Sequence, residues 1–539
     1  MHLSATPPKV RDLDALTARR FDVLVVGGGI HGLMAAWDAA TRGLHVALVE
    51  RHDFAGAASF HHHRTLHGGL RYLQTADLSR LRESVRERRT WARIAPQFIA
   101  PQPFAVIAGG PGGKAESLLR AGFAADALFA WDRNRDVPEL LHLPPGRVID
   151  ATERRGIDTG ALLPPGSVGL WYDYRTEHAE RLTFAVALAA ASAGAVLANY
   201  VDAIEPIREG RTVAGIVARD SVDGAAVRIT AHVTINATGA AAGRLTAAFG
   251  VRSSPPLVKA MNLVTTRPAP EIACGAPSAS GRLLFALPWQ GRLSIGTWHG
   301  STLCGADASM VTPDELESFL TEINQAFPSL DIRERDVALV QRGVVPAHVR
   351  FGKVELADRA IIREHRADGI DGAITLMGVK YTTARGLAQR AVTLAMAQLG
   401  KSAPPVTERT ALPGSLPDDS PSPFPSIDAQ AWAHLQRLYG ARASDVAGYV
   451  RERSSLAERI TPSLPVTGAQ VVEAVRNEMA LTLEDVVLRR TGLGSAGYPG
   501  DEAILKLESI LRDELGWTSA RVADEAQSLK EFYLPVHVK

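Results

Sequence analysis

The stretch that decides the fold is FDVLVVGGGIHGLMAAWDAATRGLHVALVE, residues 21–50. Phe21–Val26 is a mostly apolar run that predicts a buried strand, and His45–Val49 predicts a second one. Between them, Leu33–Arg42 has the pattern of a helix, and Gly43 stands where such a helix would end. The order of strand, glycine-rich turn, helix and strand is typical of a βαβ unit. We therefore expect an α/β fold with a Rossmann-like core around this unit.

The turn after the first strand carries glycines with the spacing GxGxxG, at Gly27, Gly29 and Gly32. In such a motif the first glycine permits a tight turn, the second lets the backbone approach a pyrophosphate, and the third lets the helix pack closely. The free N–H groups at the helix N-terminus favour a bound phosphate. Glu50 closes the second strand, at about the spacing expected for a carboxylate that binds a ribose. The sequence therefore predicts a dinucleotide site.

Composition excludes several classes of protein. The chain has 539 residues, enough for several domains and a deep cleft. Lys plus Arg total 59 and Asp plus Glu total 58, so the net charge of +1 argues against a dedicated nucleic-acid binder. Cys274 and Cys304 are too few for a disulfide scaffold or a cysteine-based metal site. We see no signal peptide or transmembrane run and expect a cytoplasmic protein.

A basic segment leaves a peripheral membrane contact open. Residues 80–93 contain six arginines, at positions 80, 82, 86, 88, 89 and 93. A helix with this composition can lie on an anionic membrane surface. We favour the alternative that the segment is a solvated helix with internal ion pairs.

Beyond the first unit, the pattern predicts three parts. Val227–Asn236 is strand-like and leads into a small-residue turn ending at Gly239, and Arg282–Trp298 predicts an antiparallel hairpin with its turn at Gln290-Gly291. Ala373–Met377 predicts another strand, followed by a turn and a helix to about Gln398. The predicted parts are a discontinuous cofactor-binding domain (20–95, 150–255 and 355–402), an inserted antiparallel-sheet substrate or cap domain (96–149 and 256–354), a linker (403–426) and an all-helical C-terminal domain (427–539). Within the last domain the pattern predicts helices over 428–440, 443–451, 468–489, 499–515 and 518–531.

Further motifs follow the glycine-rich turn in a fixed order. They are His67-Gly68-Gly69-Leu70-Arg71-Tyr72-Leu73, then Leu287-Pro288-Trp289, then Lys380-Tyr381-Thr382-Thr383. With these motifs the chain resembles the FAD-dependent glycerol-3-phosphate dehydrogenases over roughly residues 20–535. The resemblance implies that FAD takes a hydride from a secondary alcohol, which becomes a ketone, and that the electrons pass to a quinone or to oxygen.

The resemblance also implies roles for individual residues. The turn 27–32 would hold the FAD pyrophosphate, Glu50 the adenosine ribose, and the turn 378–383 would lie near the flavin ring. The candidate catalytic residues are Arg71, Tyr72, Lys380 and His299. The candidate cofactor-binding residues are Gly27, Gly29, Gly32, Glu50, Ser59, His61, His62, His63, Arg64, His67, Gly68, Gly239, Gly378, Lys380 and Thr382.

Two departures from the family pattern concern the substrate. The family's phosphate-binding arginine lies in a Gly-Val-Arg-Pro string, and here Val345 takes its place. A valine cannot bind a phosphate, and Arg342, three positions earlier on a predicted strand, would face the opposite side. A family active-site histidine is replaced by Asn262. We therefore expect glycerol 3-phosphate to be a poor substrate, and a polyol, a sugar-like alcohol or an amine to take its place.

A histidine cluster, His61, His62 and His63, stands where the family has small polar residues. Ser59-Phe60-His61 resembles a run in the dimethylglycine and sarcosine dehydrogenases, which implies a histidine bonded to the 8α-methyl group of the flavin. Three interpretations stay open. The cluster attaches FAD covalently through His61 or, as a less favoured alternative, through His62 or His63; it binds FAD without a covalent bond; or it binds a metal ion. We rank metal binding lowest because adjacent side chains in an extended loop point to opposite faces.

Three functions therefore compete. The leading one is an FAD-dependent dehydrogenase or oxidase that acts on CH–OH donors. The alternatives are an FAD-dependent amine oxidase or demethylase and a non-catalytic flavoprotein scaffold. The expected partners are a small alcohol or amine, with a quinone or oxygen as the electron acceptor, and no nucleic acid.

Overall fold

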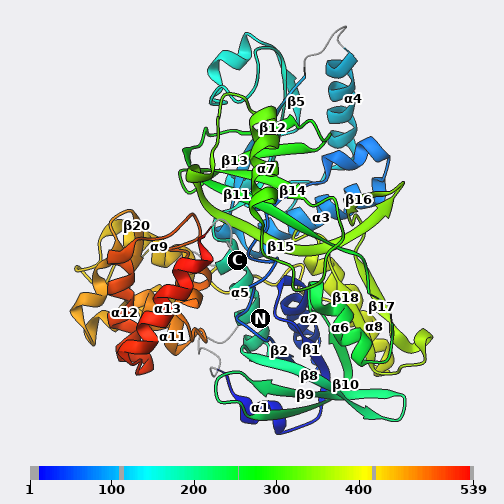
Figure 1. Cartoon of the computed structure of the whole chain (residues 1–539), viewed down its shortest axis with the longest axis vertical. Helices are drawn as coiled ribbons and strands as arrows, with labels where there is room; N and C mark the ends of the chain where they lie inside the picture. Colours follow the sequence, from blue (N-terminus) through cyan, green and yellow to red (C-terminus); the bar gives the residue numbers. More distant parts are fainter. Residues whose placement is uncertain (1–10, 109–113, 253, 416–419, 535–539) are drawn as a thin grey trace.

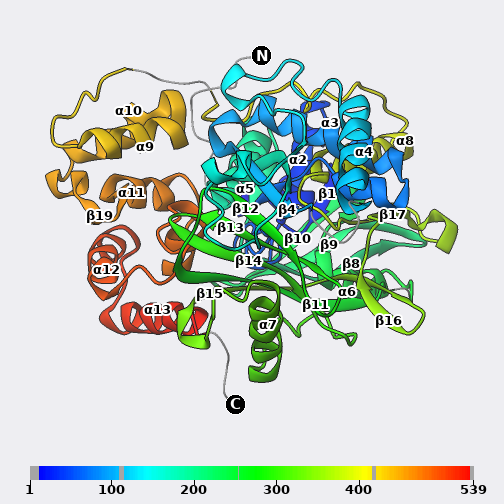
Figure 2. The same ribbon diagram turned by 90° about the horizontal axis from the view of Figure 1, so that it is seen from above.

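The computed structural model describes residues 11–108, 114–252, 254–415 and 420–534. Parts of the predicted domain ranges that fall on other residues lie outside this description. Figure 1 shows two sheets, one above the other, with a group of helices from the C-terminal part of the chain beside them. Figure 2, seen from above, places the same helices on one flank of both sheets.

The first sheet is built around the predicted βαβ unit. β1 (Phe21–Val26) pairs in parallel with β2 (Val46–Val49), and α2 (Ile30–Thr41) connects them. On one side the sheet continues to β7 (Val196–Ala198). On the other side it continues through β10 (Ala226–Asn236) and β18 (Ala373–Met377) to the antiparallel strand β17 (Ile361–Glu364). The Rossmann-like fold predicted from residues 21–50 is confirmed.

Both faces of this sheet are covered, which explains its apolar strands. Val23 and Val25 of β1 belong to a core with α2, α5 (Ala179–Ser192) and α8 (Ala384–Gln398). Leu24 and Val26 belong to a second core on the opposite face. That core contains α1 (Leu13–Thr17), α6 (Ala242–Ala248) and the hairpin of β8 (Val201–Glu209) and β9 (Thr212–Asp220), which the sequence did not reveal.

The second sheet is mostly antiparallel, and its strands come from distant parts of the chain. Its order is β16 (Lys353–Leu356), β15 (Val337–Arg350), β11 (Leu257–Pro268), β14 (Arg292–His299), β13 (Leu283–Trp289), β12 (Ala273–Pro277), β4 (Ile99–Ile107), β6 (Val168–Thr176) and β3 (Thr65–Leu66), with β5 (Arg147–Ile149) beside β6. β13 and β14 form the hairpin predicted around Gln290-Gly291. α7 (Pro313–Ala326) packs on one face of the sheet in a separate core.

Strand β6 lies in the second sheet, although the range 150–255 had placed it in the cofactor-binding domain. It pairs with β4 along all of Val168–Thr176, and this long antiparallel ladder decides its position. The segment 403–426 also differs from a free linker. Thr407 is buried and donates a hydrogen bond to Asp38 of α2, and the Leu412 N–H donates to the carbonyl of Ile94.

The C-terminal part is helical, as predicted, with α9 (Ala429–Tyr439), α10 (Ala443–Ala447), α11 (Gly468–Arg476), α12 (Asp501–Leu515) and α13 (Ser519–Phe532). It also contains a short hairpin of β19 (Arg459–Thr461) and β20 (Leu464–Thr467), which was not predicted.

The helix predicted over 468–489 is wrong. α11 ends at Arg476, and a π-helical turn covers Asp485–Arg490. Thr482 and Asp485 exchange hydrogen bonds between side chain and backbone, at 3.1 Å in both directions, and so begin a new helical segment.

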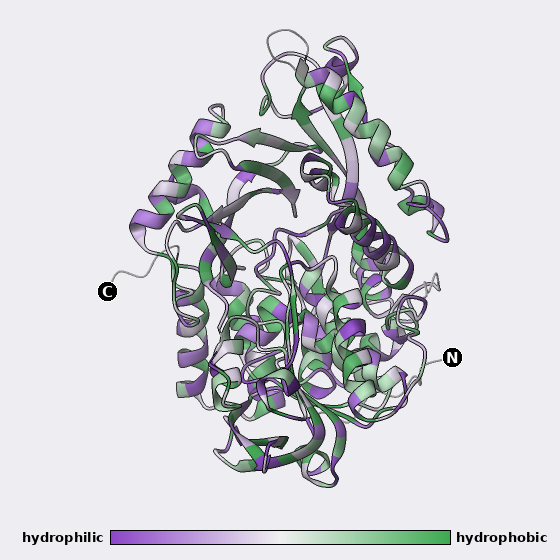
Figure 3. Ribbon diagram, turned by 90° about the vertical axis from the view of Figure 1, so that its right-hand side faces the viewer, coloured by the Kyte–Doolittle hydropathy of each residue, from purple (hydrophilic) through white to green (hydrophobic). Residues whose placement is uncertain are grey.

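The arginine-rich segment forms α3 (Leu78–Ile94), and its charges are largely paired. The pairs are Arg80 with Asp77 and Asp358, Arg82 and Arg89 with Asp132, and Arg88 with Asp173. Most of these carboxylates belong to other elements, so α3 is tied into the molecule; a contact with a membrane surface, the less favoured alternative, stays a prediction. Among the described residues, no helix is long and apolar enough to cross a bilayer. Figure 3 accordingly shows hydrophilic and hydrophobic residues mixed along the helices.

Candidate active site

A cavity of about 2090 Å³ lies between the carboxyl ends of the first sheet and one face of the second. A pocket for a single small ligand usually measures ~300 to 1000 Å³, so this cavity has room for an extended dinucleotide and a second molecule. The segments that follow β1, β2, β10 and β18 all line it. In open parallel sheets this edge is where ligands bind.

The glycine-rich turn fits a dinucleotide by its geometry. Gly27 has φ +109°, and a Cβ there would lie 2.6 Å from the carbonyl oxygen of Ala237. A Cβ on Gly32 would lie 1.9 Å from the carbonyl oxygen of Gly27, so only glycine lets α2 pack this closely on the turn. Gly27 and Gly29 line the cavity, and the N-terminus of α2 borders it. The turn therefore leaves exposed backbone where a pyrophosphate would lie.

Glu50 is fixed at the end of β2, on the cavity wall. Its carboxylate accepts hydrogen bonds from the N–H of Gly28 at 2.6 Å and from the N–H of His52 at 3.0 Å. Gly239, which follows β10 with φ +58°, lines the same part of the cavity and has open space at its Cα. This geometry suits the predicted ribose-binding role of Glu50.

Residues 51–64, which we call the histidine loop, run along the cavity after Glu50. Ser59 accepts a hydrogen bond at its Oγ from the Ile30 N–H at 2.9 Å, which fixes the loop to the start of α2. The Nδ1 atom of His61 accepts one from the Arg342 N–H at 3.2 Å. The Nε2 atom of His61 has no hydrogen-bond partner among the described residues and is not among their shielded polar atoms. Because His61 lines the cavity, this nitrogen is open to it.

The other two histidines are held differently. His62 stacks on Tyr381 at 4.3 Å between ring centroids, and its Nδ1–H donates to the Ser59 carbonyl at 2.9 Å. Its Nε2 atom is shielded and unpartnered. The Nε2–H of His63 donates to the Ser294 carbonyl at 3.4 Å. Burial lowers the pKa of His62 to about 3 and that of His63 to about 4, so both rings are neutral near pH 7.

Arg64 does not reach the cavity, and its predicted role as a cofactor ligand is wrong on this geometry. Its side chain is buried between the rings of Phe60 and Trp289 and forms an ion pair with Glu180 at 3.1 Å. Gly68 is also not among the residues that line the cavity: its N–H donates to Asp173 at 2.6 Å, and a Cβ there would meet Arg88. Both residues position the loop that carries the neighbouring side chains.

Lys380, Tyr72 and Arg71, three of the candidate catalytic residues, come together on the cavity wall. The Lys380 ammonium lies 4.0 Å from the centre of the Tyr72 ring. Burial, with a smaller contribution from the Arg71 charge, lowers the pKa of Lys380 to about 8. Lys380 can therefore exchange a proton near neutral pH, which an exposed lysine does not do.

The turn 378–383 packs tightly against neighbouring residues of the protein. A Cβ on Gly378 would lie 1.7 Å from the Nε2 atom of His31, whose ring is neutral because burial lowers its pKa to about 4. Thr382 accepts the N–H of His67 at 3.2 Å, which joins this turn to the His67–Tyr72 motif. His31 lines the cavity and was missed by the sequence analysis, although it lies within the glycine-rich motif itself.

The histidines of the second sheet are less convincing bases. The Nδ1–H of His299 donates to the carbonyl of its neighbour Gly300, and burial lowers its pKa. His348 is paired with Glu355 at 3.1 Å. Both line the cavity. Trp289 and Trp298 of the same sheet are buried and are not among the residues that line the cavity.

Aromatic residues missed by the sequence analysis form the wall on the second sheet. Phe104 and Trp171 stack at 5.4 Å, and Phe285 meets both rings edge-on. All three line the cavity. Phe532, the last residue of α13, lines it as well. Such contacts between distant strands and domains leave no local signal in the sequence.

The two positions that depart from the family pattern also border the cavity. Val345 presents an apolar side chain there. Asn262 is buried, and both polar atoms of its amide are hydrogen-bonded inside the protein: Nδ2 donates to the His61 carbonyl at 3.0 Å, and Oδ1 accepts from Thr297 at 2.7 Å. The Arg342 guanidinium lies over the Phe532 ring at 5.4 Å. Within the described part of the chain, no group of three or more His, Cys, Asp and Glu side chains could hold a metal ion.

Two family models match this chain. A model described as FAD dependent oxidoreductase matches residues 22–397, and one described as the C-terminal domain of alpha-glycerophosphate oxidase matches residues 373–522. The chain is 30% identical to a glycerol-3-phosphate dehydrogenase of Synechocystis sp., over 97% of this chain and 98% of that protein. It is 29% identical to glycerol-3-phosphate dehydrogenase 2 of Mycobacterium tuberculosis, over 95% and 87% of the two chains.

A solved structure has the same fold. The glycerol-3-phosphate dehydrogenase from Bacillus halodurans, complexed with FAD, matches with a TM-score of 0.74 and 23% identity over 98% of each chain.

Proposed function

Because this chain belongs to the family of FAD-dependent oxidoreductases, we propose that it oxidises a secondary alcohol to a ketone, with FAD as the hydride acceptor. The resemblance to the glycerol-3-phosphate dehydrogenases extends over nearly the whole chain, so the helical C-terminal part shares it. The residues present suit FAD. The turn 27–32 would hold its pyrophosphate, Glu50 its ribose, and the turn 378–383 with the N-terminus of α8 its flavin end.

The observation that carries the proposal is the position and ionisation of Lys380. Oxidation of an alcohol requires a base that accepts the hydroxyl proton, and a base works best when its pKa lies near the working pH. With a pKa of about 8, Lys380 supplies a neutral amine at mildly alkaline pH. Bound FAD supplies the two-electron acceptor. Lys380 accepts the hydroxyl proton, and Arg71 and Tyr72 orient the substrate oxygen at the same wall.

The substrate is expected to differ from glycerol 3-phosphate. The Val345 side chain offers no hydrogen bond to a phosphate, and the Asn262 amide binds His61 and Thr297 of the protein. Arg342 lies on the same wall, but its guanidinium is held against Phe532. We therefore propose an unphosphorylated polyol or sugar-like alcohol as the substrate.

The test is a screen for flavin bleaching without oxygen. Polyols, phosphorylated polyols and N-methyl amines are added to the oxidised protein, and the loss of flavin absorbance is followed. We expect rapid bleaching by an unphosphorylated alcohol. Rapid bleaching by glycerol 3-phosphate at low concentration would overturn the substrate assignment. Bleaching by an amine alone would favour an amine oxidase or demethylase, and bleaching by no alcohol or amine would favour a scaffold.

The reduced flavin must then pass its electrons on. We propose a quinone or oxygen as the acceptor, and mixing the bleached protein with each will distinguish them by the rate at which the absorbance returns.

We further propose that His61, and not its two neighbours, attaches FAD covalently. The Nε2 atom of His61 faces the cavity, whereas that of His62 is shielded and that of His63 binds a carbonyl. Substitution at Nε2 leaves Nδ1 as an acceptor, which matches the N–H that Arg342 directs at it. His61 would lose its Nε2 proton and gain a bond to the 8α carbon, which loses one proton. The two electrons pass into the flavin ring and then to dioxygen.

A further inference from the structure

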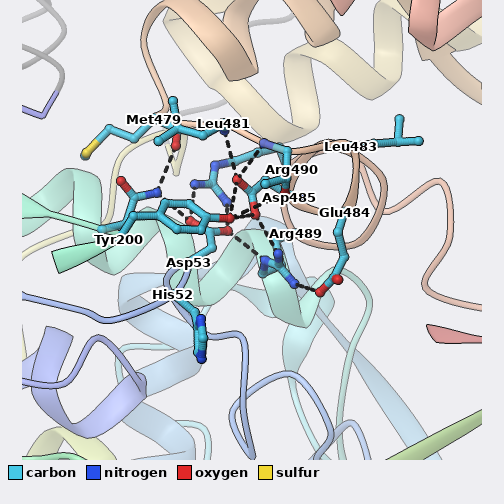
Figure 4. Close-up of polar contacts among 12 residues, drawn as sticks. His52, Asp53, Tyr200, Met479, Leu481, Leu483, Glu484, Asp485, Arg489 and Arg490 are labelled. Carbon is cyan, nitrogen blue, oxygen red and sulfur yellow. Dashed lines mark hydrogen bonds and ion pairs between the residues drawn. The ribbon is translucent and has the colours of Figure 1, made fainter. Parts of the chain in front are cut away.

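The helical domain (α9 to α13 and the turns between them) contacts the histidine loop at two points. At one point Asp53 of the loop binds Arg489 and Arg490 of the helical domain. At the other, Phe532 of α13 packs against His61. Figure 4 shows the first contact, where side chains from the segment after β7, from the loop after β2 and from the π-helical turn meet.

The contact at Asp53 is a buried cluster of oppositely charged side chains. Arg490 donates to both carboxylate oxygens of Asp53, at 2.7 and 2.8 Å, and Arg489 donates to one of them at 2.7 Å. Asp53 and Arg490 are 1% exposed each. Burial alone would raise the pKa of Asp53, but the two arginines outweigh it and lower that pKa to about 2. Asp53 therefore stays ionised, and within the described part of the chain its carboxylate is bound by Arg489 and Arg490 of the helical domain and by the amide of Asn199.

The cluster extends to the backbone that supports Glu50. Arg489 also binds Asp485 at 2.6 Å, and Asp485 accepts the hydroxyl of Tyr200 at 2.8 Å. Asn199 donates to both Asp53 and the Met479 carbonyl. These two residues follow β7, and this segment is bonded to the Glu50 loop: the Tyr200 N–H donates to the His52 carbonyl, and the Val201 N–H to that of Glu50. The helical domain thus supports the backbone on both sides of Glu50, the carboxylate proposed to bind the ribose.

The second contact lies at the other end of the loop. The Phe532 ring stacks on His61 with 6.0 Å between centroids and meets Phe60 edge-on at 6.3 Å. The guanidinium of Arg342 also lies over the Phe532 ring, and the backbone N–H of Arg342 donates a hydrogen bond to His61. Without α13, His61 would lose the aromatic surface that fixes its ring.

We propose that the helical domain contributes to FAD binding. Asp53 is then a positioning residue that couples docking of this domain to binding of FAD. Removing one partner from a buried ion pair leaves an uncompensated charge, so the loop can keep its cofactor-binding shape only while the arginines are docked. Coupling between two binding events is reciprocal, so FAD must also hold the helical domain in place. The proposal rests on FAD as the cofactor and is independent of the proposed substrate.

The test uses full-length protein with Asp53→Asn. Titration of the flavin-free protein with ADP, which has no flavin ring to attach to His61, measures the affinity of the site without any turnover. We expect ADP to bind more weakly to the variant, by roughly 5- to 150-fold, the usual range of such couplings. Hydrogen exchange of the backbone at Asp485–Arg490 should be faster in the variant, and FAD should slow it in the native protein. Asp513→Asn is the matched control, since Asp513 pairs with Arg453 on the surface of the helical domain, away from the loop.

A milder variant separates coupling from loss of folding. Tyr200→Phe removes one hydrogen bond to Asp485 and leaves Asp53 and its arginines intact. We expect a smaller loss of ADP affinity, with native circular dichroism. Unchanged affinities in both variants would overturn the proposal. So would exchange at Asp485–Arg490 that FAD does not alter.

Discussion

At the scale of single residues, the chemistry depends on a lysine whose charge the fold controls. Lys380 is partly removed from water and lies near Arg71, and both effects favour its neutral form. Its contact with the Tyr72 ring favours the charged form, because a cation is attracted to an aromatic face. The lowered pKa shows which effect dominates. A lysine in this state can act as a base, whereas an exposed lysine stays protonated until about pH 10.4.

This ionisation predicts the pH dependence of the reaction. As pH rises through about 8, Lys380 loses its proton, so kcat/KM should rise and then level off. Lys380→Met should remove this rise and lower kcat by roughly 10²- to 10⁴-fold. Arg71→Gln removes a positive charge that disfavours the ammonium form, so the pKa and the rise should move to higher pH. Steady-state kinetics between about pH 6 and pH 10, a range that brackets this pKa, provides the measurement.

Lys506→Met on α12 is the control and should keep the native profile. A pH profile that survives Lys380→Met would exclude Lys380 as the base.

The residues near the glycine-rich turn could be predicted from the sequence because their roles are local. Gly27, Glu50 and Lys380 stand in strings whose spacing reflects a turn, a strand end or a helix start. Arg64 could not be placed in this way. Its neighbours in sequence suggested a cofactor ligand, but its partner Glu180 is far away in the chain and draws the side chain into the core.

At the scale of elements, the histidine loop shows how one segment gives three adjacent imidazoles different states. Consecutive side chains of an irregular loop point in different directions. His61 accordingly accepts a backbone N–H, whereas His62 and His63 donate to carbonyls. We assign the covalent bond to His61 because, of these three histidines, His61 alone has an Nε2 atom that is both open to the cavity and without a hydrogen-bond partner.

The attachment can be tested by the mass of the denatured protein. We expect the native chain to carry the mass of one FAD less two hydrogen atoms, and the denatured polypeptide to remain fluorescent. His61→Asn should abolish the added mass, while the matched variants His62→Asn and His63→Asn should retain it. Native protein of unmodified mass, or attachment that persists in His61→Asn, would contradict the assignment.

Elements were predictable where their pattern is strong and local. β1 was predicted to the residue, because its apolar run ends at the glycine-rich turn. The break between α11 and the π-helical turn was missed, although Thr482 and Asp485 have the spacing of a helix start. Strand β6 could not be assigned to its sheet, because the choice depends on pairing with β4, which precedes it by a long insertion.

At the scale of the whole molecule, the cores do not follow the predicted parts. One continuous core includes β1, α2 and α5 of the first sheet together with α9, α11 and α12 of the helical domain. The second sheet has its own core with α7. The sequence suggested a linker at 403–426 and hence a separate helical domain. The structure buries apolar surface across that boundary, which ties the helical domain to the cofactor-binding sheet.

This arrangement predicts that the first sheet and the helical domain unfold together. Leu488 is fully buried in the π-helical turn, which packs on α5. Leu488→Ala should destabilise the shared core by about 2–5 kcal/mol. If the core is one cooperative unit, the amides of β1 should lose as much protection against hydrogen exchange as those of α11. Phe319→Ala, in the separate core under α7, is the matched control and should weaken the protection of α7 but not that of β1. Unchanged protection of β1 in Leu488→Ala would mean that the helical domain opens by itself, and the coupling between its docking and FAD binding would then have to act without a shared core.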